Sequence, residues 1–125
     1  MREVVITDRG PKPIGPYSQA VKSGGFIFVS GQVALDAKTG EFMGGDIRQQ
    51  TERTLNNIKA ILEAAGANLH HVVKTTVFLK DLAEFTAMNE VYGRYFSSAP
   101  PARSTVQVAR LPKDALVEIE VIAAI

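Results

Sequence analysis

The C-terminal part of the chain brings an arginine and two glutamates onto two segments with alternating side chains. Arg103 lies in the segment 103–109, and Glu118 and Glu120 lie in the segment 116–123. A guanidinium can hold a carboxylate or a phosphate through two parallel hydrogen bonds. A partly desolvated carboxyl has a raised pKa and can move a proton to or from water. These residue types are therefore suited to binding an anionic substrate and activating water.

Strand periodicity predicts how these side chains are arranged. If the two segments form a hairpin about the middle of their connecting loop, Thr105 lies opposite Glu120, and Arg103 is a diagonal neighbour of Glu120 on the same face. Glu118 then faces Gln107, further from Arg103, so Glu120 is the expected base and Glu118 its rival. The alternative is an exposed ion pair, which contributes about 0–1 kcal/mol and does no chemistry. The residues alone leave both interpretations open.

Other polar residues carry weaker signals. His70 and His71 are adjacent, so on a strand they point to opposite faces and cannot bind one metal ion together; without cysteine, a zinc site is not expected. Tyr17 follows a Gly-Pro turn, Ser30–Gly31 ends a strand, and Asn89 interrupts an apolar helical stripe. Each also fits a plain structural role.

The first half of the chain predicts two strands and a long helix that must position these residues. The apolar run 26–29 is bounded by glycines and predicts a buried strand, with a further strand at 18–22 before it. Asp46 is the expected N-cap of a helix of about 20 residues. Gly66 is its expected stop. This helix is long enough to cover one face of a small sheet.

The second half predicts a strand, a helix and the terminal hairpin. Alternate residues of the strand 72–79 share one face, namely Val73, Thr75, Val77 and Leu79. Asp81 is the expected N-cap of the second helix, with Glu84 as its capping-box partner. The helix ends before Pro100–Pro101. Its apolar stripe comprises Leu82, Phe85, Met88, Val91, Tyr92 and Tyr95.

This order of elements predicts one α+β domain over residues 1–125, with two helices on a sheet of about six strands. Two helices cover only one face of such a sheet, yet the strand 26–29 is apolar on both faces, and Phe78 lies opposite to Val77 and Leu79. Another copy of the chain is the simplest cover, so we expect a homo-oligomer. A monomer with a partly exposed apolar sheet is the alternative.

Composition excludes several classes of protein. The chain has 125 residues, 46% of them hydrophobic, and a formal net charge of +1, which argues against disorder and against a charged nucleic-acid-binding tail. The absence of cysteine excludes a disulfide framework, a thiolate metal site and a cysteine nucleophile. Asp8 and Arg9 interrupt any N-terminal signal core, and no apolar run is long enough to span a membrane. A cytoplasmic protein is therefore expected.

Five motifs, taken together, resemble those of the RidA/YjgF family of enamine/imine deaminases. The resemblance covers essentially the whole chain, and the motifs follow the family's order. They are the segments Ile14–Ala20, Ser30–Gln32, Thr54–Ile58, Val73–Val77, and Pro101–Ser104 together with Val117–Glu120.

The resemblance implies a fold like that of small trimeric chorismate mutases, with a mixed sheet and two helices on one face, and clefts between three subunits. It implies hydrolysis of 2-iminobutanoate and 2-iminopropanoate (or 2-aminoacrylate) to 2-keto acids and ammonia, without a metal or other cofactor. Arg103 would hold the substrate carboxylate, and Glu120 would position or activate water. The substrate-binding positions would be Tyr17, Ser30, Gly31, Asn89 and Thr105. Position 105 is a cysteine in many members, so the threonine leaves substrate preference open.

Two other functions compete with this one. An endoribonuclease or translation inhibitor is also attributed to the family, but the chain has no basic stripe, so nucleic acid is not an expected partner. A non-enzymatic chaperone or metabolite-binding module would also keep Arg103. Neither membrane nor cofactor is expected.

Overall fold

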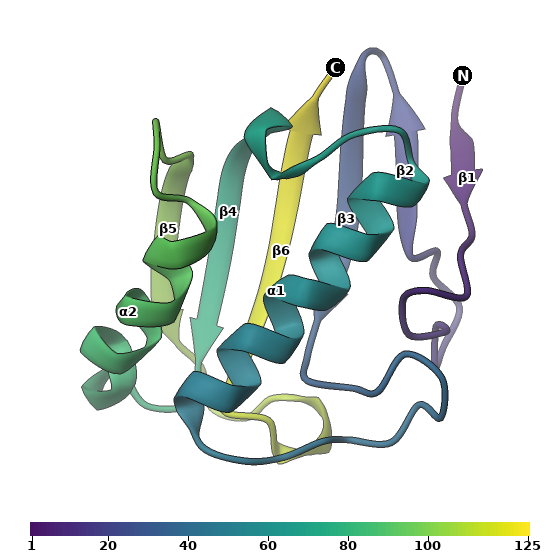
Figure 1. Ribbon diagram of the computed structural model, residues 1–125. Helices are drawn as coiled ribbons and strands as arrows, with labels where there is room; N and C mark the ends of the chain where they lie inside the picture. The colour runs from purple at the N-terminus through teal and green to yellow at the C-terminus, as the bar shows by residue number, and fades with distance from the viewer.

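A mixed sheet of six strands carries both long helices on one face (Figure 1). The computed structural model describes residues 1–125. The strands are β1 (Glu3–Val5), β2 (Ala20–Ser23), β3 (Phe26–Gln32), β4 (Val72–Leu79), β5 (Ala102–Gln107) and β6 (Val117–Ala124). The helices are α1 (Ile47–Ala64) and α2 (Phe85–Tyr95), with short 3₁₀ turns at Leu69–His71, Leu82–Glu84 and Pro112–Asp114. The α+β class, the strand number and the helix placement are those predicted.

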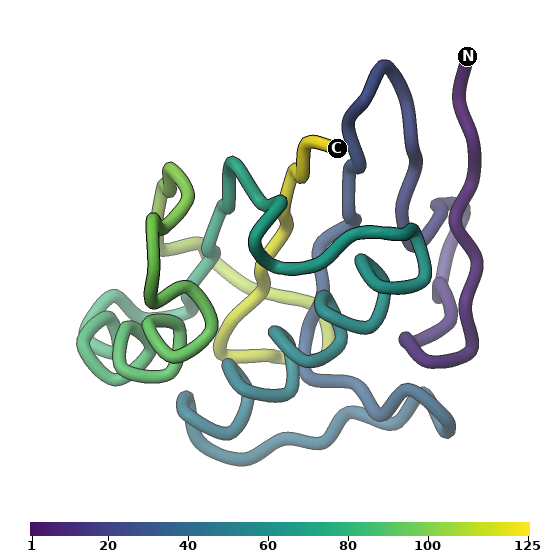
Figure 2. The backbone as a smooth tube through the Cα atoms, turned by 45° about the horizontal axis from the view of Figure 1, so that its top comes forward, coloured from purple at the N-terminus to yellow at the C-terminus, as the bar shows by residue number.

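The strand order across the sheet is β1-β2-β3-β6-β4-β5. Every neighbouring pair is antiparallel except β4 and β5, which are parallel. The last strand, β6, therefore lies in the middle of the sheet, between β3 and β4, and β5 forms an edge (Figures 1 and 2). Neither helix combines the length and apolar composition needed to cross a membrane.

Helix α1 confirms the predicted N-terminus. The Asp46 carboxylate accepts a hydrogen bond from the Gln49 backbone N–H at 2.9 Å, and the Gln49 side chain accepts one from the Asp46 N–H, also at 2.9 Å. This capping box satisfies two backbone donors that a helix start leaves unpaired. The helix ends at Ala64, and Gly66 soon after it stops the chain from continuing as a helix, with a φ of +88° that glycine adopts without strain.

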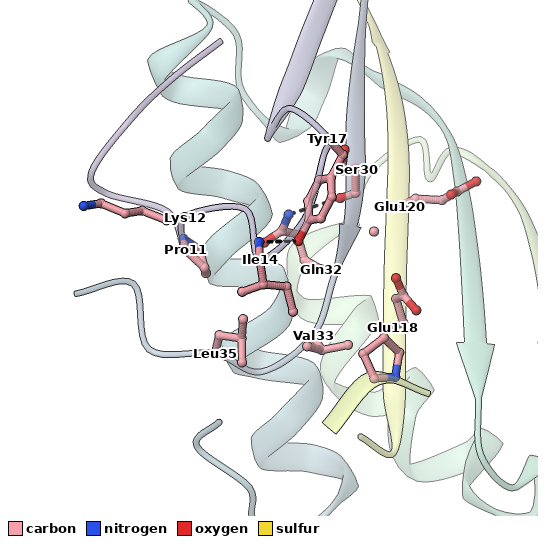
Figure 3. A pocket seen from close by; sticks show the side chains of 12 residues that line it. Pro11, Lys12, Ile14, Tyr17, Ser30, Gln32, Val33, Leu35, Glu118 and Glu120 are labelled. Carbon is pink, nitrogen blue, oxygen red and sulfur yellow. Dashed lines mark hydrogen bonds between the residues drawn. The ribbon is translucent and has the colours of Figure 1, made fainter. Parts of the chain in front are cut away.

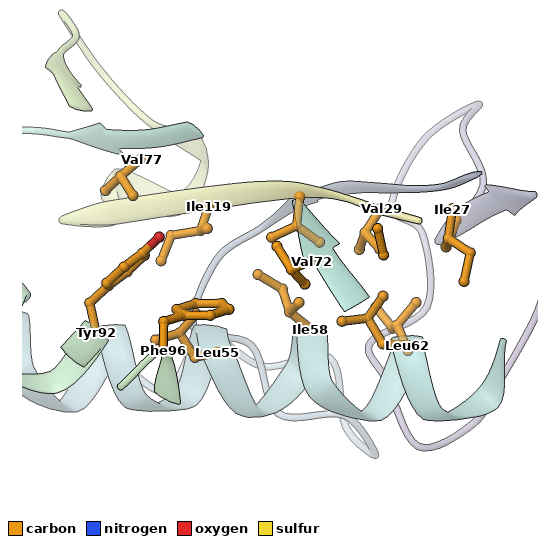
Figure 4. Close-up of a cluster of buried hydrophobic side chains, with 14 of the residues drawn as sticks. Ile27, Val29, Leu55, Ile58, Leu62, Val72, Val77, Tyr92, Phe96 and Ile119 are labelled. Carbon is orange, nitrogen blue, oxygen red and sulfur yellow. The ribbon is translucent and has the colours of Figure 1, made fainter. Parts of the chain in front are cut away.

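The main core lies between the helices and the sheet (Figure 4). Ile58, Ile61 and Leu62 of α1 are fully buried, as are Val77 of β4 and Ile119 of β6. The apolar spacing of α1 and the alternation along the strands bring these side chains to one interface, and this burial is the main source of stability.

Helix α2 begins later than predicted. Asp81 does accept a hydrogen bond, from the Ala83 N–H at 2.9 Å, but the turn that it caps is the 3₁₀ segment Leu82–Glu84. Glu84 makes no side-chain cap, and the helix itself starts at Phe85. The predicted capping box at this helix is therefore wrong, because a 3₁₀ turn precedes the first α-helical residue.

A bulge at the start of β4 makes the prediction wrong for Val73. The pairing of β4 with β6 shifts between Val72 and Lys74. Val72 is consequently buried in the core and Val73 is exposed, whereas Thr75, Val77 and Leu79 face the helices as predicted. One extra residue in a strand moves the side chains that precede it to the opposite face of the sheet.

The predicted terminal hairpin is wrong, because β4 lies between β5 and β6. Arg103 pairs with Thr75 of β4, and Glu120 pairs with Thr76 on the other side of the same strand. Thr105 pairs with Val77 and is not opposite Glu120.

The face of the sheet away from the helices, here called the open face, is partly apolar. Phe26 and Phe28 on β3 are both 43% exposed, with ring centroids 6.2 Å apart. A smaller cluster of Val33, Leu35, Leu111 and Ala115 packs at one end of this face. The strand 26–29 is thus apolar on both faces, as predicted.

Candidate functional site

Two groups of the predicted site residues form separate clusters in the chain. The first, here called the acidic pocket, is a cavity of about 390 Å³ on the open face (Figure 3). A cavity of this size suits a small ligand. Its lining includes four predicted site residues and the rival carboxylate, namely Tyr17, Ser30, Gly31, Glu120 and Glu118.

An irregularity in β3 opens this pocket. The pairing of β3 with β6 shifts between Val29 and Gln32, so Ser30 and Gly31 do not follow the regular ladder. The Ser30 hydroxyl donates to the Ser18 carbonyl at 2.5 Å, which ties this segment to the loop that carries Tyr17. Bulges of this kind often redirect side chains beside functional sites.

Glu118 packs directly against Gly31. A Cβ atom at position 31 would lie 2.9 Å from Cδ of Glu118 and closer still to a carboxylate oxygen, so a side chain at this position would displace the carboxyl from its place. Burial raises the pKa of Glu118, and the negative charge of Glu120 raises it further. Glu118 is half-buried, whereas Glu120 is exposed, and in Figure 3 the Glu120 carboxylate extends away from Tyr17.

Tyr17 lies at the mouth of the pocket. Its hydroxyl accepts a hydrogen bond from the Ile14 N–H at 3.2 Å, which fixes the ring across the turn, and its side chain remains 45% exposed. The hydroxyl keeps its own proton available for a ligand.

The second cluster, here called the arginine edge, lies where β5 meets α2. It comprises Phe85, Asn89, Tyr92, Arg103 and Thr105. The guanidinium carbon of Arg103 lies 4.7 Å from the ring centroid of Tyr92 and 5.4 Å from that of Phe85. The chain's three ion pairs involve other arginines, so Arg103 has no carboxylate partner.

Asn89 and Thr105 belong to this edge by their positions. Phe85, Asn89 and Tyr92 are spaced by four and three residues, so they share one stripe of α2. Thr105 is two residues from Arg103 on β5 and shares its face; its hydroxyl is buried without a hydrogen-bond partner.

The two clusters lie on opposite faces of the sheet. Thr75, the partner of Arg103 on β4, is buried and hydrogen-bonded to α2, which identifies the helix face. Glu118 and Glu120 lie on the open face of β6. The prediction that Arg103 and Glu120 share a face is therefore wrong: their strands are two spacings apart, about 10 Å, and they point in opposite directions. Within one chain, a ligand held by Arg103 is out of reach of both glutamates.

Some features of the site were missed from the sequence alone. Tyr92 is buried in the main core as the apolar stripe predicts, but Phe85 is 38% exposed, and the spacing of both with Asn89 is a signal that three side chains face β5 together. His70 and His71 lie in a 3₁₀ turn before β4, where the His71 ring accepts a hydrogen bond from the Asn68 N–H at 3.1 Å and so has a structural role. No group of three or more His, Cys, Asp or Glu side chains is arranged to hold a metal ion.

Comparison with known proteins gives consistent similarities. The family model described as endoribonuclease L-PSP matches residues 7–125. A RutC family protein of Pyrococcus horikoshii is 59% identical over 98% of both chains. A protein of Dermatophagoides farinae named 2-iminobutanoate/2-iminopropanoate deaminase is 44% identical over 99% of this chain and 97% of its own. The crystal structure of RidA from an Antarctic Psychrobacter is 47% identical, with a TM-score of 0.94, and covers 98% of this chain and 99% of that one.

Proposed function

The chain belongs to the RidA/YjgF family, and from this premise we propose that residues 1–125, acting as a single domain, hydrolyse reactive 2-imino acids to 2-keto acids and ammonia. The substrates that we propose are 2-iminobutanoate and 2-iminopropanoate, the latter in exchange with 2-aminoacrylate. The observation that carries the proposal is the Glu118 carboxyl, which packs against Gly31 in the acidic pocket and has a raised pKa.

Arg103 is the proposed carboxylate-binding group. It has no carboxylate partner within the chain, and its guanidinium lies over the rings of Tyr92 and Phe85. A cation–π contact does not use all five N–H donors of a guanidinium, so a bidentate hydrogen-bond pair with a carboxylate can still form.

Glu118 is the proposed base, in place of Glu120. The preference for Glu120 depended on the hairpin register, which the strand order overturns. Of the two carboxyls, Glu118 is the one that is half-buried, packed against backbone and raised in pKa. A pKa nearer to neutral favours both accepting and returning a proton. Glu120 then contributes by its charge, which raises the pKa of Glu118.

The reaction needs only water and proton transfer. The Glu118 carboxylate accepts a proton from water as its oxygen bonds to the iminium carbon, which gives a neutral carbinolamine. Glu118 returns that proton to the nitrogen. The C–N bond then breaks as the hydroxyl loses its proton and becomes the keto oxygen, and the departing ammonia takes up that proton as ammonium. Acid–base help of this kind contributes about 10²–10⁴-fold.

The site needs a second copy of the chain. Arg103 and Glu118 lie on opposite faces, and the open face around the acidic pocket exposes Phe26 and Phe28. We propose a homotrimer in which the arginine edge of one chain meets the acidic pocket of its neighbour. Covering this face would bury the exposed rings and complete the site in one step.

Ribonuclease activity has weaker support from the residues. The family description names an endoribonuclease, but the net charge is only +1, and the His71 ring is occupied as a cap. A steep loss of RNA binding with increasing salt would support phosphate contacts and argue for this alternative.

The test is keto-acid release from imine generated in place by a threonine dehydratase. We expect the wild-type protein to accelerate release above spontaneous hydrolysis, and Arg103→Ala to abolish the acceleration. Arg48→Ala is a matched control, because Arg48 pairs with Glu90 on the helix surface, away from both clusters. A wild-type protein that gives no acceleration would overturn the proposal.

A further inference from the structure

We infer that Tyr92 is a positioning residue for Arg103, and that the buried hydroxyl of Thr75 fixes Tyr92 in that role. The inference deepens the proposed function, since it concerns how the carboxylate-binding guanidinium is held. The guanidinium carbon of Arg103 lies 4.7 Å from the ring centroid of Tyr92, closer than to any other ring.

Tyr92 is itself held in place from two sides. Its hydroxyl lies 2.7 Å from the Thr75 hydroxyl, in a hydrogen bond between two buried side chains. Its ring packs against Phe96, with the centroids 4.7 Å apart. A buried ring with a paired hydroxyl has one orientation, so Tyr92 presents a fixed face to β5.

The strand register links Thr75 to Arg103. These two residues are direct partners in the parallel pair β4–β5, and both point toward α2. The same register therefore brings the Thr75 hydroxyl under the Tyr92 hydroxyl and the Arg103 side chain over the Tyr92 ring.

Such positioning matters because Arg103 has no charged partner and lies on an edge strand. A free arginine side chain samples many rotamers, and holding one of them on binding costs conformational entropy. The contact with the Tyr92 ring restricts the Arg103 side chain before a ligand arrives. Phe85 is the weaker contact, because its ring is farther away and 38% exposed.

The first test uses the protein alone, so it does not depend on the proposed function. Ring currents from Tyr92 should move the Arg103 Nε–H resonance away from those of solvent-exposed arginines in an NMR spectrum. Tyr92→Leu should bring it back toward them, whereas the matched control Phe42→Leu, which truncates a ring packed against the small cluster of Val33 and Leu35, should not. An Arg103 resonance unchanged by Tyr92→Leu would overturn the inference.

The second test asks whether Tyr92 acts through Arg103. We expect Tyr92→Leu to weaken binding of 2-oxobutanoate, and to raise KM for the imine, by about tenfold, with a smaller change in kcat. In the Arg103→Ala background the same substitution should have no further effect on 2-oxobutanoate binding. Equal losses in both backgrounds would show a purely structural role and overturn the inference.

A third test uses two other variants, so that the inference can be tested even if Tyr92→Leu does not fold. Thr75→Val leaves the Tyr92 hydroxyl unpaired and should loosen the ring, whereas Thr75→Val combined with Tyr92→Phe removes both hydroxyls and keeps the ring. We expect the double variant to recover the Arg103 resonance and most of the binding that Thr75→Val loses. Failure of this recovery would overturn the role of Thr75.

Wild-type protein that neither binds 2-oxobutanoate nor accelerates hydrolysis would overturn the proposed function. The NMR test would then still decide whether Tyr92 positions Arg103.

Discussion

Glu118 and Glu120 are one pleat apart on β6, yet only Glu118 packs against backbone. Glu118→Gln keeps the shape of the side chain and removes the base, so we expect kcat to fall by about 100-fold or more. Glu120→Gln should lower kcat by less than about tenfold, because that carboxylate is exposed. Keto-acid release checks both, with Glu41→Gln as a surface control. A greater loss of kcat in Glu120→Gln than in Glu118→Gln would show that Glu120 is the base.

The same carboxyl makes folding pH-dependent. Burial, and then the charge of Glu120, raises the pKa of Glu118 above its ordinary value of 4.5. The folded chain therefore binds this proton more tightly than the unfolded chain does, so the stabilisation is full below pH 4.5 and is lost as the pH rises through the raised pKa. We expect Glu118→Gln to raise Tm over wild type at about pH 7 and not at about pH 3. Thermal unfolding at a fixed protein concentration checks this, and an equal gain at both pH values would contradict it.

Arg103→Lys tests the guanidinium geometry. The charge is kept, but an ammonium cannot make two parallel hydrogen bonds and stacks less well on Tyr92. We expect most of the activity to be lost, with a cost of about 2–5 kcal/mol in kcat/KM. Steady-state kinetics of this variant, with Arg48→Lys as the control, checks the prediction. Unchanged kinetics in Arg103→Lys would show that Arg103 does not bind the substrate.

At the scale of elements, the start of α1 gives the sharpest prediction. Asp46→Ala removes the acceptor for the Gln49 N–H, so we expect it to lower the free energy of unfolding by about 1 kcal/mol. Asp46→Asn keeps an acceptor and should lose much less. Denaturant unfolding of both variants checks this; equal losses would mean that charge at the helix start, and not the hydrogen bond, is responsible.

Elements with local signals were predictable from the sequence. Helix α1 follows from its cap at Asp46, its apolar spacing and Gly66, all of which act within a few residues. The start of α2 was not predictable, because Asp81 caps a 3₁₀ turn and an α-helix equally well.

Relations between strands were less predictable. Alternation correctly separated Val117 and Ile119 from Glu118 and Glu120 within β6. It says nothing about which strand lies beside β6, and a hairpin has the same sequence pattern as two antiparallel strands with a third inserted between them. The residue types of the site were therefore predictable, whereas the opposite faces of Arg103 and Glu120 depended on where β4 lies.

At the scale of the whole molecule, we expect three chains to associate through their open faces. Light scattering should give three times the chain mass of 13.5 kDa. Phe28→Glu should yield folded monomers without activity, because it introduces charge into the covered apolar face. Met43→Glu is the control, since Met43 is 51% exposed against 43% for Phe28 but lies in the loop before α1 and not on a strand. A wild-type monomer at micromolar concentration would contradict the assembly.

A site shared between chains can be detected by mixing two variants that are each inactive alone. Arg103→Ala and Glu118→Gln should each be inactive alone, but chains refolded together should regain about one quarter of the wild-type rate if they mix at random. Each restored site takes its arginine from one variant and its glutamate from the other. No recovery would mean that both residues act within one chain.

The opposite placement of Arg103 and Glu118 also determines how an assembly tolerates a faulty subunit. In the trimer that we propose, every chain gives its arginine to one site and its glutamate to another. A faulty copy with one of these residues changed disables a single site, whereas a copy that misfolds at the shared face can spoil its neighbours as well. A mixture of intact and altered chains would then tolerate damage to the chemistry better than damage to the packing.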